Sequence, residues 1–320
     1  MFKPMNLFFL FSIFVSICII LSSNNLFINW VGLEMSLISF IPLLNKKFNT
    51  IFFESSLKYF LAQAIGSTLF IFSMLLSILF KFFMVMVMVS LILKLGGSPM
   101  HFWFISVSKQ LSWSNNFILF TLQKIGPIYL LYFLQISNIL LVLGLISMIT
   151  GGWGALKETN TRSILAYSSL ANLGWMLISL KMSVSIMLVY FVIYMITTLL
   201  IICMFNFMNL TYLNQLVYFN KFTISLTFIN IMSLSGLPPF LGFLPKWMIL
   251  TFLINNNFIF FTLLILWVTM ISIYFYVRLL YFYLILENYT LKFNKTLKSS
   301  KILFMNSIII LGIPLLEFLM

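Results

Sequence analysis

The sequence predicts an all-α, polytopic membrane protein with about eleven transmembrane helices. Of its 320 residues, 62% are hydrophobic and only 7% are charged, whereas a soluble domain is nearer half apolar and a quarter charged. The polar residues that would cover so large an apolar core in water are missing. The formal net charge is +13, but the basic residues lie between long apolar runs instead of gathering on one polar face, which argues against a nucleic-acid-binding protein.

The spans follow from the length of each apolar run, because a helix that crosses the bilayer needs about 20 mostly apolar residues. They run over residues 5–22, 26–44, 57–79, 82–108, 115–133, 137–154, 160–179, 183–207, 223–254, 258–286 and 302–319. Two of them, 82–108 and 223–254, are too long for a plain crossing and contain Gly/Pro breaks. Ser and Asn dilute the span 160–179, so we expect it to face protein rather than lipid. The first span has no basic leader and no small-residue cleavage site, so we interpret it as a retained helix.

The two broken spans are the fourth and the ninth, so each is the fourth helix of a five-helix unit. We expect a single membrane domain, 1–320, made of two repeats over 5–133 and 137–286, with an extra C-terminal helix at 302–319. Because five is an odd number, consecutive units have opposite topology and the repeats are inverted. Paired broken helices at equivalent positions of two repeats are typical of transporters.

Eleven spans place the two chain ends on opposite sides of the membrane. Twelve Lys and Arg residues fall on the side of the N-terminus, and two, Lys81 and Lys181, fall on the other. By the positive-inside rule, the N-terminus is on the cytoplasmic or matrix side. The twelve are Lys3, Lys46, Lys47, Lys58, Lys109, Lys157, Arg162, Lys221, Lys292, Lys295, Lys298 and Lys301. We interpret the last four as a solvated loop, with a lipid-headgroup patch as the alternative.

Five charged residues inside the spans are not explained by the loops. Arg278 is nearer a helix end, where its side chain can reach the membrane surface, and the other four lie deeper. Glu34 and Lys124 are in the middle of theirs, Lys94 directly precedes one break, and Lys246 follows the other. A charge at the bilayer centre costs about 2.5–3.5 kcal/mol on insertion scales, so these residues need a reason to be there. A structural ion pair between Glu34 and one lysine would explain two of them and leave two lysines without a carboxylate.

The breaks indicate a polar pathway. They read Gly96-Gly97-Ser98-Pro99 and Gly236-Leu237-Pro238-Pro239. Pro99 cannot donate to the Leu95 carbonyl, and Pro239 cannot donate to that of Ser235. Carbonyls freed at membrane depth are tolerated only where protein or water satisfies them.

Two further residues lie close to these features. Pro127, three residues after Lys124, predicts a third break. His101, the only histidine, follows Pro99 by two residues. A lone histidine is more often a packing residue, but its place beside a broken helix leaves a proton-relay role equally open, because histidine exchanges protons near neutral pH.

Most other chemistry is excluded. One His, two distant cysteines (Cys18 and Cys203) and no Asp provide no metal or haem ligand set and no disulfide framework. The run Gly151-Gly152-Trp153-Gly154 lacks the strand that a nucleotide-binding glycine loop follows. What remains is the movement of protons or ions.

Five motifs surround the charged residues and the breaks. They are Trp30-Val31-Gly32-Leu33-Glu34-Met35-Ser36, Lys94-Leu95-Gly96-Gly97-Ser98-Pro99-Met100-His101-Phe102-Trp103, Gln123-Lys124-Ile125-Gly126-Pro127, Ser163-Ile164-Leu165-Ala166-Tyr167-Ser168-Ser169 and Ser235-Gly236-Leu237-Pro238-Pro239-Phe240-Leu241-Gly242-Phe243 with Lys246. Together they are highly specific. The chain resembles, over about residues 6–286, the NADH dehydrogenase (ubiquinone) subunit 2 family, the mitochondrially encoded antiporter-like subunits of respiratory complex I.

The resemblance implies proton pumping driven by NADH:ubiquinone oxidoreduction elsewhere in the complex. Glu34 and Lys94 would form a charge pair, Lys124 would be the central relay lysine, Lys246 the distal lysine, and His101 a position on the hydrated axis. We expect no cofactor and no metal in this chain, because FMN, the iron–sulfur clusters and the ubiquinone site would belong to other subunits.

The resemblance also implies partners and a location. We expect the other membrane-arm subunits of complex I and phospholipids such as cardiolipin as partners, and no nucleic acid. The chain would be a multi-pass protein of the mitochondrial inner membrane, with its N-terminus in the matrix and its C-terminus in the intermembrane space. Two alternatives stay open: a cation/proton antiporter subunit of the multisubunit bacterial type, which shares these motifs, and a purely structural membrane-arm subunit whose charges hold helices together.

Overall fold

The computed structural model describes residues 4–44, 50–134, 137–213, 215, 219 and 221–286. Apart from one isolated bridge between Asn160 and Tyr212, the regular secondary structure of these residues is helical, which confirms the predicted all-α class. The chain forms two compact units that meet after Leu143. The predicted span 302–319 and the lysines from Lys292 to Lys301 lie outside the described residues.

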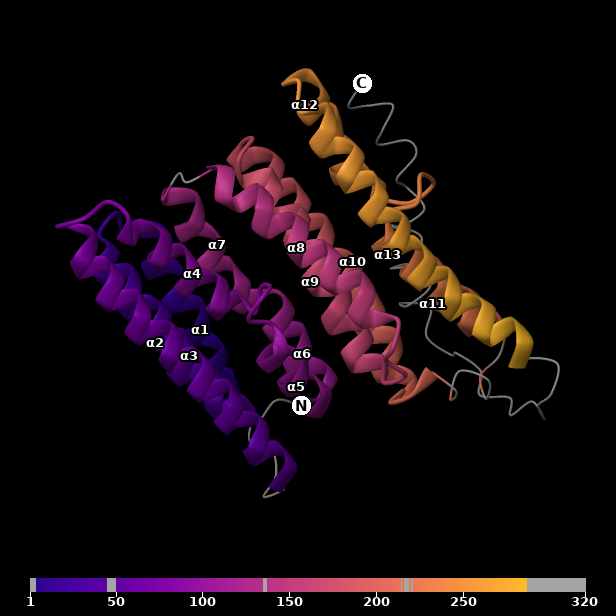
Figure 1. The fold of residues 1–320 in the computed structure, drawn as a ribbon. Coiled ribbons are helices and arrows are strands. Elements are labelled where there is room, and N and C mark those ends of the chain that lie inside the picture. The colour runs from indigo at the N-terminus through magenta and orange to yellow at the C-terminus, as the bar shows by residue number, and fades with distance from the viewer. Residues whose placement is uncertain are drawn as a thin grey trace. The chain divides into compact units, whose positions relative to one another are not determined.

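The first unit is a bundle of consecutive helices that lie side by side. Its helices are α1 (Pro4–Ser22), α2 (Leu26–Leu44), α3 (Thr50–Ser77), α4 (Phe83–Leu95), α5 (Phe102–Gln110), α6 (Trp113–Phe120) and α7 (Leu122–Phe133). Figure 1 shows them in indigo to magenta, with α1 against α2 and α3 against α4. Helix α7 contacts α1, α2 and α4, so the predicted site helices share one core.

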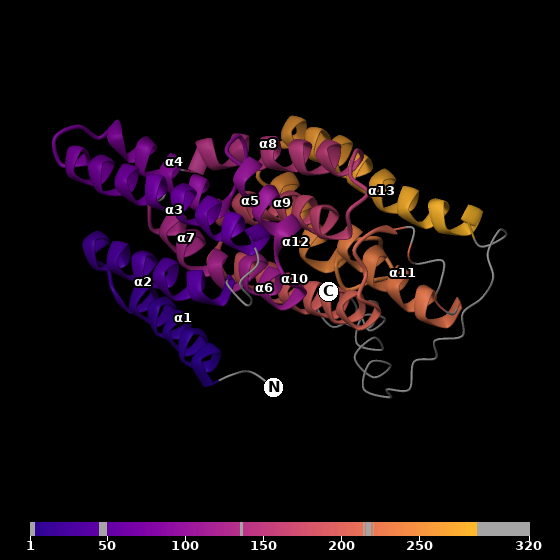
Figure 2. The same ribbon diagram turned by 90° about the horizontal axis from the view of Figure 1, so that it is seen from below.

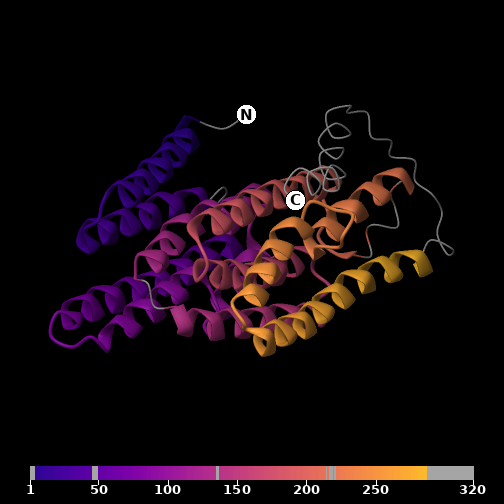
Figure 3. The same ribbon diagram turned by 90° about the horizontal axis from the view of Figure 1, so that it is seen from above.

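The second unit is built in the same way. Its helices are α8 (Ser137–Ala155), which begins before the boundary, α9 (Thr161–Leu180), α10 (Val184–Met208), α11 (Lys221–Ser235), α12 (Phe243–Asn255) and α13 (Ile259–Leu286). Helix α9 contacts α10 and α12, and α13 contacts α11 and α12. Figure 2 shows the run of α8 to α11, and Figure 3 shows α12 and α13 meeting at the turn over residues 256–258.

Each of the ten predicted spans that fall in the described part coincides with one helix or with two, although α3 begins seven residues before its predicted span. Seven helices of this part are long and apolar enough to cross a membrane. Three predicted spans are each divided into two helices: 82–108 into α4 and α5, 115–133 into α6 and α7, and 223–254 into α11 and α12. The most apolar stretch of α9 is 89% buried, against 22–50% for the other six. This confirms that the Ser- and Asn-rich span 160–179 faces protein.

Polar side chains cap the first turns of α9 and α10. The Asn160 side chain accepts a hydrogen bond from the Arg162 amide at 3.1 Å and begins α9, and the Ser183 side chain accepts one from the Ile186 amide at 3.3 Å and begins α10. Such caps satisfy amides that have no partner within the helix. Asn209, with φ 52°, ends α10 in the left-handed conformation.

The two predicted breaks are present, and each begins with a glycine in the left-handed conformation. Helix α4 ends at Gly96 with φ 69°, and α11 is followed by Gly236 with φ 75°. Glycine adopts this left-handed conformation at little cost. In both breaks a proline, Pro99 or Pro239, follows three residues later and prevents the first helix from continuing.

The predicted third break at Pro127 is wrong in its position. Helix α7 runs through Pro127, and the interruption lies six residues earlier, at Thr121, whose φ and ψ are −119° and −77°. The Thr121 hydroxyl donates to the Phe117 carbonyl at 2.6 Å, and the Lys124 amide bonds to the Thr121 carbonyl three residues back at 3.0 Å. Threonine hydroxyls that bond to backbone carbonyls compete with the helical ladder, so the helix restarts before the proline.

Helices α8 and α9 cross closely because glycines face each other. A Cβ atom built on Gly174 would lie 2.5 Å from the Gly144 carbonyl oxygen, and one built on Gly151 would lie 2.7 Å from the Ala171 amide nitrogen. Small residues at such positions let membrane helices approach backbone to backbone. This crossing anchors α9, the most buried helix of the second unit.

We therefore predict that Gly174→Ala destabilises the protein. The new methyl group would meet the Gly144 backbone, which cannot move alone, and overpacking of this kind costs about 1–3 kcal/mol. The midpoint of thermal unfolding in detergent should fall. The control is Gly152→Ala, whose methyl group would lie 3.3 Å from the end of the Ile271 side chain and should leave the midpoint nearly unchanged. An equal midpoint for both variants would contradict the close crossing.

Candidate functional site

The first unit brings Glu34 and Lys94 together, as predicted. Glu34 is on α2 and Lys94 is in the last turn of α4. The Lys94 Nζ and Glu34 Oε1 atoms are 3.8 Å apart, and the two side chains are 2% and 24% exposed. This separation is within reach of a salt bridge but longer than a direct hydrogen bond. The pair therefore joins a buried lysine to a half-buried carboxylate.

One face of α3 holds Lys94 in place. The Gln63 amide donates to the Lys94 carbonyl at 3.0 Å. A Cβ atom on Gly66 would lie 2.8 Å from the Lys94 Cγ atom, so only glycine leaves room for this lysine stem. Tyr59, one turn before Gln63, is buried on the same face. Helix α3 thus shapes the environment of a lysine that belongs to α4.

The end of α4 also finds hydrogen-bond donors within the unit. The Trp103 indole donates to the Leu93 carbonyl at 3.0 Å, and the Gly97 amide donates to that of Ile92 at 2.9 Å. The Ile92 and Leu93 carbonyls, in the last turn of α4 before the first break, are therefore satisfied by protein groups, which is the condition for irregular backbone at membrane depth.

His101 is held within its own loop. Its Nδ1 atom lies 3.3 Å from the Ser98 hydroxyl and 3.2 Å from the Pro99 carbonyl oxygen, and its ring stacks on Phe102 at 4.3 Å between centroids. The side chain is buried at the start of α5. It lies in the same unit as Glu34 and Lys94, directly after the first break.

Lys124 is one of the most deeply buried side chains of the first unit. It lies on α7, is 1% exposed, and its Nζ atom is 5.4 Å from the centroid of the Phe104 ring on α5. The neighbouring Gln123 accepts a hydrogen bond from the Tyr59 hydroxyl at 3.2 Å. Tyr59 therefore connects α7 to the same face of α3 that holds Lys94.

Three residues of this environment were not predicted from the sequence: Tyr59, Gln63 and Gln123. The available signal was a Tyr–Gln–Gly series at positions 59, 63 and 66, spaced so that all three share one face of an otherwise apolar helix. The predicted candidates had been selected by their charge inside a span or, for His101, by its place beside the first break.

The second unit contains Lys246, on α12 after the second break. It is 7% exposed, and its Nζ atom donates to the Ser235 carbonyl at 2.6 Å and lies 5.7 Å from the centroid of the Trp175 ring. A Cβ atom on Gly236 would lie 2.8 Å from this Nζ atom. The carbonyl that Pro239 leaves free is thus bound by the lysine, as expected for a freed carbonyl in a membrane helix.

Side-chain clusters that could hold a metal ion are absent from the part of the chain that the structure describes. It contains no group of three or more His, Cys, Asp or Glu side chains that could hold a metal ion. Cys18 and Cys203 are both free thiols. The chemistry of the described site is therefore that of buried lysines, one carboxylate and one imidazole.

A family model for the membrane part of NADH:quinone oxidoreductase and Mrp antiporter subunits matches residues 76–272. This stretch includes both breaks, together with Lys94, His101, Lys124 and Lys246. The chain is also 39% identical over 292 residues to NADH-ubiquinone oxidoreductase chain 2 of Anopheles gambiae, which covers 87% of this chain and 86% of the relative.

Solved structures share the fold. A chain of respiratory complex I from Thermus thermophilus superposes with a TM-score of 0.84 at 20% identity, over 97% of this chain and 78% of its own. A chain of the Mrp complex from Dietzia sp. gives a TM-score of 0.75 at 17% identity, over 85% of this chain and 59% of its own. At these identities the likeness concerns the fold alone, whereas the sequence match to the Anopheles relative covers 87% of this chain. The chain belongs to the NADH:quinone oxidoreductase/Mrp antiporter family and, within it, to the NADH-ubiquinone oxidoreductase chain 2 family.

Proposed function

We propose that this chain is the antiporter-like membrane-arm subunit of a mitochondrial complex I and relays protons through Glu34, Lys94, His101, Lys124 and Lys246. The observation that carries the proposal is the hydrogen bond from Lys246 to the Ser235 carbonyl. A carboxylate partner would hold a lysine in its charged form, but a carbonyl accepts a hydrogen bond from an ammonium and from a neutral amine alike. Lys246 can therefore release a proton and keep its place.

The Glu34–Lys94 pair supplies a different element of the relay. Opposite charges 3.8 Å apart stabilise each other strongly in a poorly solvated site. Opening the pair would leave Lys94 as a buried cation without its counter-charge, and burial disfavours that charged form. A small movement of either side chain would therefore change how firmly Lys94 holds its proton.

The proposed architecture is a pair of inverted five-helix repeats over 5–133 and 137–286. Its support is the shared course of the two breaks, with left-handed Gly96 and Gly236, and a boundary between compact units after Leu143. The repeats differ in their ionisable groups, because Lys94 precedes its break and Lys246 follows its own.

We further propose the other membrane-arm subunits and phospholipids such as cardiolipin as partners, with FMN, iron–sulfur clusters and ubiquinone bound elsewhere in the complex. The support is the name of the relatives, which is that of a respiratory enzyme chain. An Mrp-type antiporter subunit is the second candidate, since the Dietzia complex shares the fold, but the 39% identity to a chain 2 protein over 87% of this chain favours complex I.

The decisive experiment replaces Lys246 in the assembled complex. We predict that Lys246→Met, which keeps the length and apolar stem, allows assembly but lowers proton pumping per assembled complex by roughly a hundredfold, the lower range for loss of a proton-transfer group. Lys246→Arg should be impaired as well, because arginine stays protonated. Reconstituted complexes with a pH-sensitive dye and NADH measure both.

The matched control is Lys157→Met, which removes an exposed lysine of the turn between α8 and α9 and should pump at the wild-type rate. A Lys246→Arg complex that pumps normally would mean that only the positive charge matters. A Lys246→Met complex that fails to assemble would favour the purely structural role.

We predict that Glu34→Gln abolishes most pumping and weakens assembly. Removing one member of a buried pair leaves an uncompensated charge and costs about 3–5 kcal/mol, whereas removing both avoids it. The double variant Glu34→Gln/Lys94→Met should therefore assemble better than the single variant while remaining inactive. Native gel electrophoresis and pumping assays measure the two effects.

The control for the pair is Glu54→Gln. Glu54 forms an exposed ion pair with Lys58 on α3, and exposed pairs contribute about 0–1 kcal/mol, so assembly and pumping should be unchanged. Normal pumping by Glu34→Gln would remove the pair from the relay.

The proposed orientation places the N-terminus in the matrix. We predict that a membrane-impermeant amine reagent modifies Lys157 in inside-out inner-membrane particles and Lys81 in mitoplasts, because both lysines are exposed in turns and the charge bias puts them on opposite sides. Peptide mass spectrometry identifies the modified lysine. The reverse pattern would invert the topology.

A further inference from the structure

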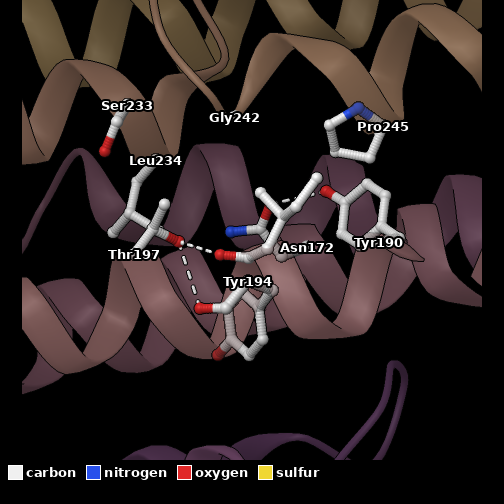
Figure 4. Close-up of a pocket in the computed structure, with 9 residues that line it drawn as sticks. Asn172, Tyr190, Tyr194, Thr197, Ser233, Leu234, Gly242 and Pro245 are labelled. Carbon is white, nitrogen blue, oxygen red and sulfur yellow. Dashed lines mark hydrogen bonds between the residues drawn. The ribbon is translucent and has the colours of Figure 1, made fainter. Parts of the chain in front are cut away.

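Two hollows in the second unit differ in size and in chemistry. The smaller one lies between α9, α10, α11 and the start of α12, and leaves about 10 Å³ for the centre of a water molecule. In its wall the Tyr190 hydroxyl donates to the Asn172 Oδ1 atom at 2.8 Å (Figure 4). The larger one lies where the end of α8, the segment after α10 and α13 meet, and leaves about 40 Å³ for such centres. Because one water needs about 10–15 Å³ of this space, the smaller hollow admits one water and the larger one admits about three water-sized groups.

The larger hollow has a positive and a negative side chain in its wall. Arg278 of α13 and Glu158 of the turn after α8 line it, together with apolar side chains such as Leu156 and Phe275. The Arg278 Nη1 atom donates to the Leu156 carbonyl, which lies just after the end of α8, where helical carbonyls lack partners within the helix. The Glu158 Oε2 atom accepts a hydrogen bond from the Ser163 hydroxyl at 2.9 Å. Hydrogen bonds within the chain therefore hold both charged groups in place.

Exposed aromatic side chains indicate the depth of this hollow in the membrane. Tyr274 and Tyr281 are exposed on α13 and lie one turn before and one turn after Arg278, so all three share one face of the helix. Trp153, in the last turn of α8, is exposed as well. Tryptophan and tyrosine gather at the level of the lipid headgroups, and an arginine near a helix end extends toward that level. The hollow therefore lies where a lipid headgroup meets the protein.

The two charges select the kind of headgroup. A guanidinium presents five N–H donors in a fork that matches a phosphate, and the Leu156 carbonyl occupies only one of its nitrogens. The Glu158 carboxylate has further lone pairs and favours a positive group that donates hydrogen bonds. A headgroup of phosphates alone, such as that of cardiolipin, would meet this carboxylate without a counter-charge. A choline headgroup has no N–H donor and is bulkier than a primary ammonium.

We propose that this hollow binds the phosphoethanolamine headgroup of a phospholipid, with its phosphate on Arg278 and its ammonium on Glu158. The two carbons and the nitrogen of ethanolamine match the room in the hollow. The acyl chains lie along the exposed apolar side chains of α13, which include Met270 and Val277. The inference rests on the membrane location in the proposed function and names the chemical class of one lipid partner.

The test labels the intact complex with photoreactive lipids. The wild-type complex, in nanodiscs of phosphatidylcholine, receives a small fraction of phosphatidylethanolamine with a photoreactive group at the start of one acyl chain, or of phosphatidylcholine with the same chain. After illumination, peptide mass spectrometry locates the label. We expect phosphatidylethanolamine to label α13 around Arg278 about tenfold more than phosphatidylcholine does, the effect of one hydrogen bond to a charged group.

Two variants of the complex assign the two charges. Arg278→Gln keeps an amide donor for the Leu156 carbonyl and removes the positive charge, so it should lower labelling of this site by either lipid about tenfold. Glu158→Gln keeps an acceptor for Ser163 and removes the negative charge, so it should abolish the preference for phosphatidylethanolamine. The second variant keeps the test valid if the first assembles poorly, because Arg278 also supports the end of α8.

The control is Lys81→Gln, which removes an exposed lysine from the turn between α3 and α4 of the first unit and should leave the labelling of α13 unchanged. Equal labelling by the two lipids in the wild type, no label on α13, wild-type labelling of Arg278→Gln, or an unchanged preference in Glu158→Gln would each overturn the inference. Loss of the label on adding millimolar phosphoethanolamine, which has no acyl chains, would indicate a site for soluble phosphates instead. None of these outcomes concerns pumping, so a failed test leaves the proton relay to be judged by Lys246→Met.

Discussion

The structure depends on one constraint: a backbone carbonyl inside a membrane protein must find a donor other than bulk water. Each helix break frees carbonyls at the depth where donors are scarce. In the first unit the Gln63 amide and the Trp103 indole donate to the end of α4, and in the second unit Lys246 itself donates to Ser235. The first role of these residues is therefore to donate hydrogen bonds to backbone carbonyls near each break.

This difference in donors gives the two breaks different chemistry. Neutral groups donate to the carbonyls at the end of α4, and the Lys94 side chain instead faces Glu34. The charge of Lys94 therefore depends on how closely the two side chains are held. At the second break the lysine is the donor, and its partner is a neutral carbonyl that tolerates either protonation state. The same backbone turn thus serves one lysine that faces a carboxylate and another that is bound to a backbone carbonyl.

Much of this arrangement could be predicted from the sequence, because the length of apolar runs and the position of Gly and Pro act locally. The spans and the breaks at Gly96 and Gly236 are of this kind. The residues alone predicted a pair between Glu34 and one lysine, and only the resemblance to the family indicated that this lysine is Lys94. The break at Thr121 was missed because a threonine hydroxyl competed with the helix more effectively than Pro127. The roles of Tyr59 and Gln63 could not be predicted, since they depend on which face of α3 meets α4.

A glycine next to each of two buried lysines, Lys94 and Lys246, explains how a long charged side chain stays among the helices. Lysine stems normally extend toward the bilayer surface, but Lys94 runs against the bare backbone of Gly66 and Lys246 against that of Gly236. Contact with backbone fixes the stem without adding a charge that would fix the proton. The glycine therefore constrains position and leaves protonation free, which is the combination that a buried proton carrier requires. Gly236 has two roles, because it also adopts the left-handed turn that ends α11. Its lack of a side chain leaves room for Lys246, which donates to the Ser235 carbonyl in place of the backbone amide that Pro239 lacks.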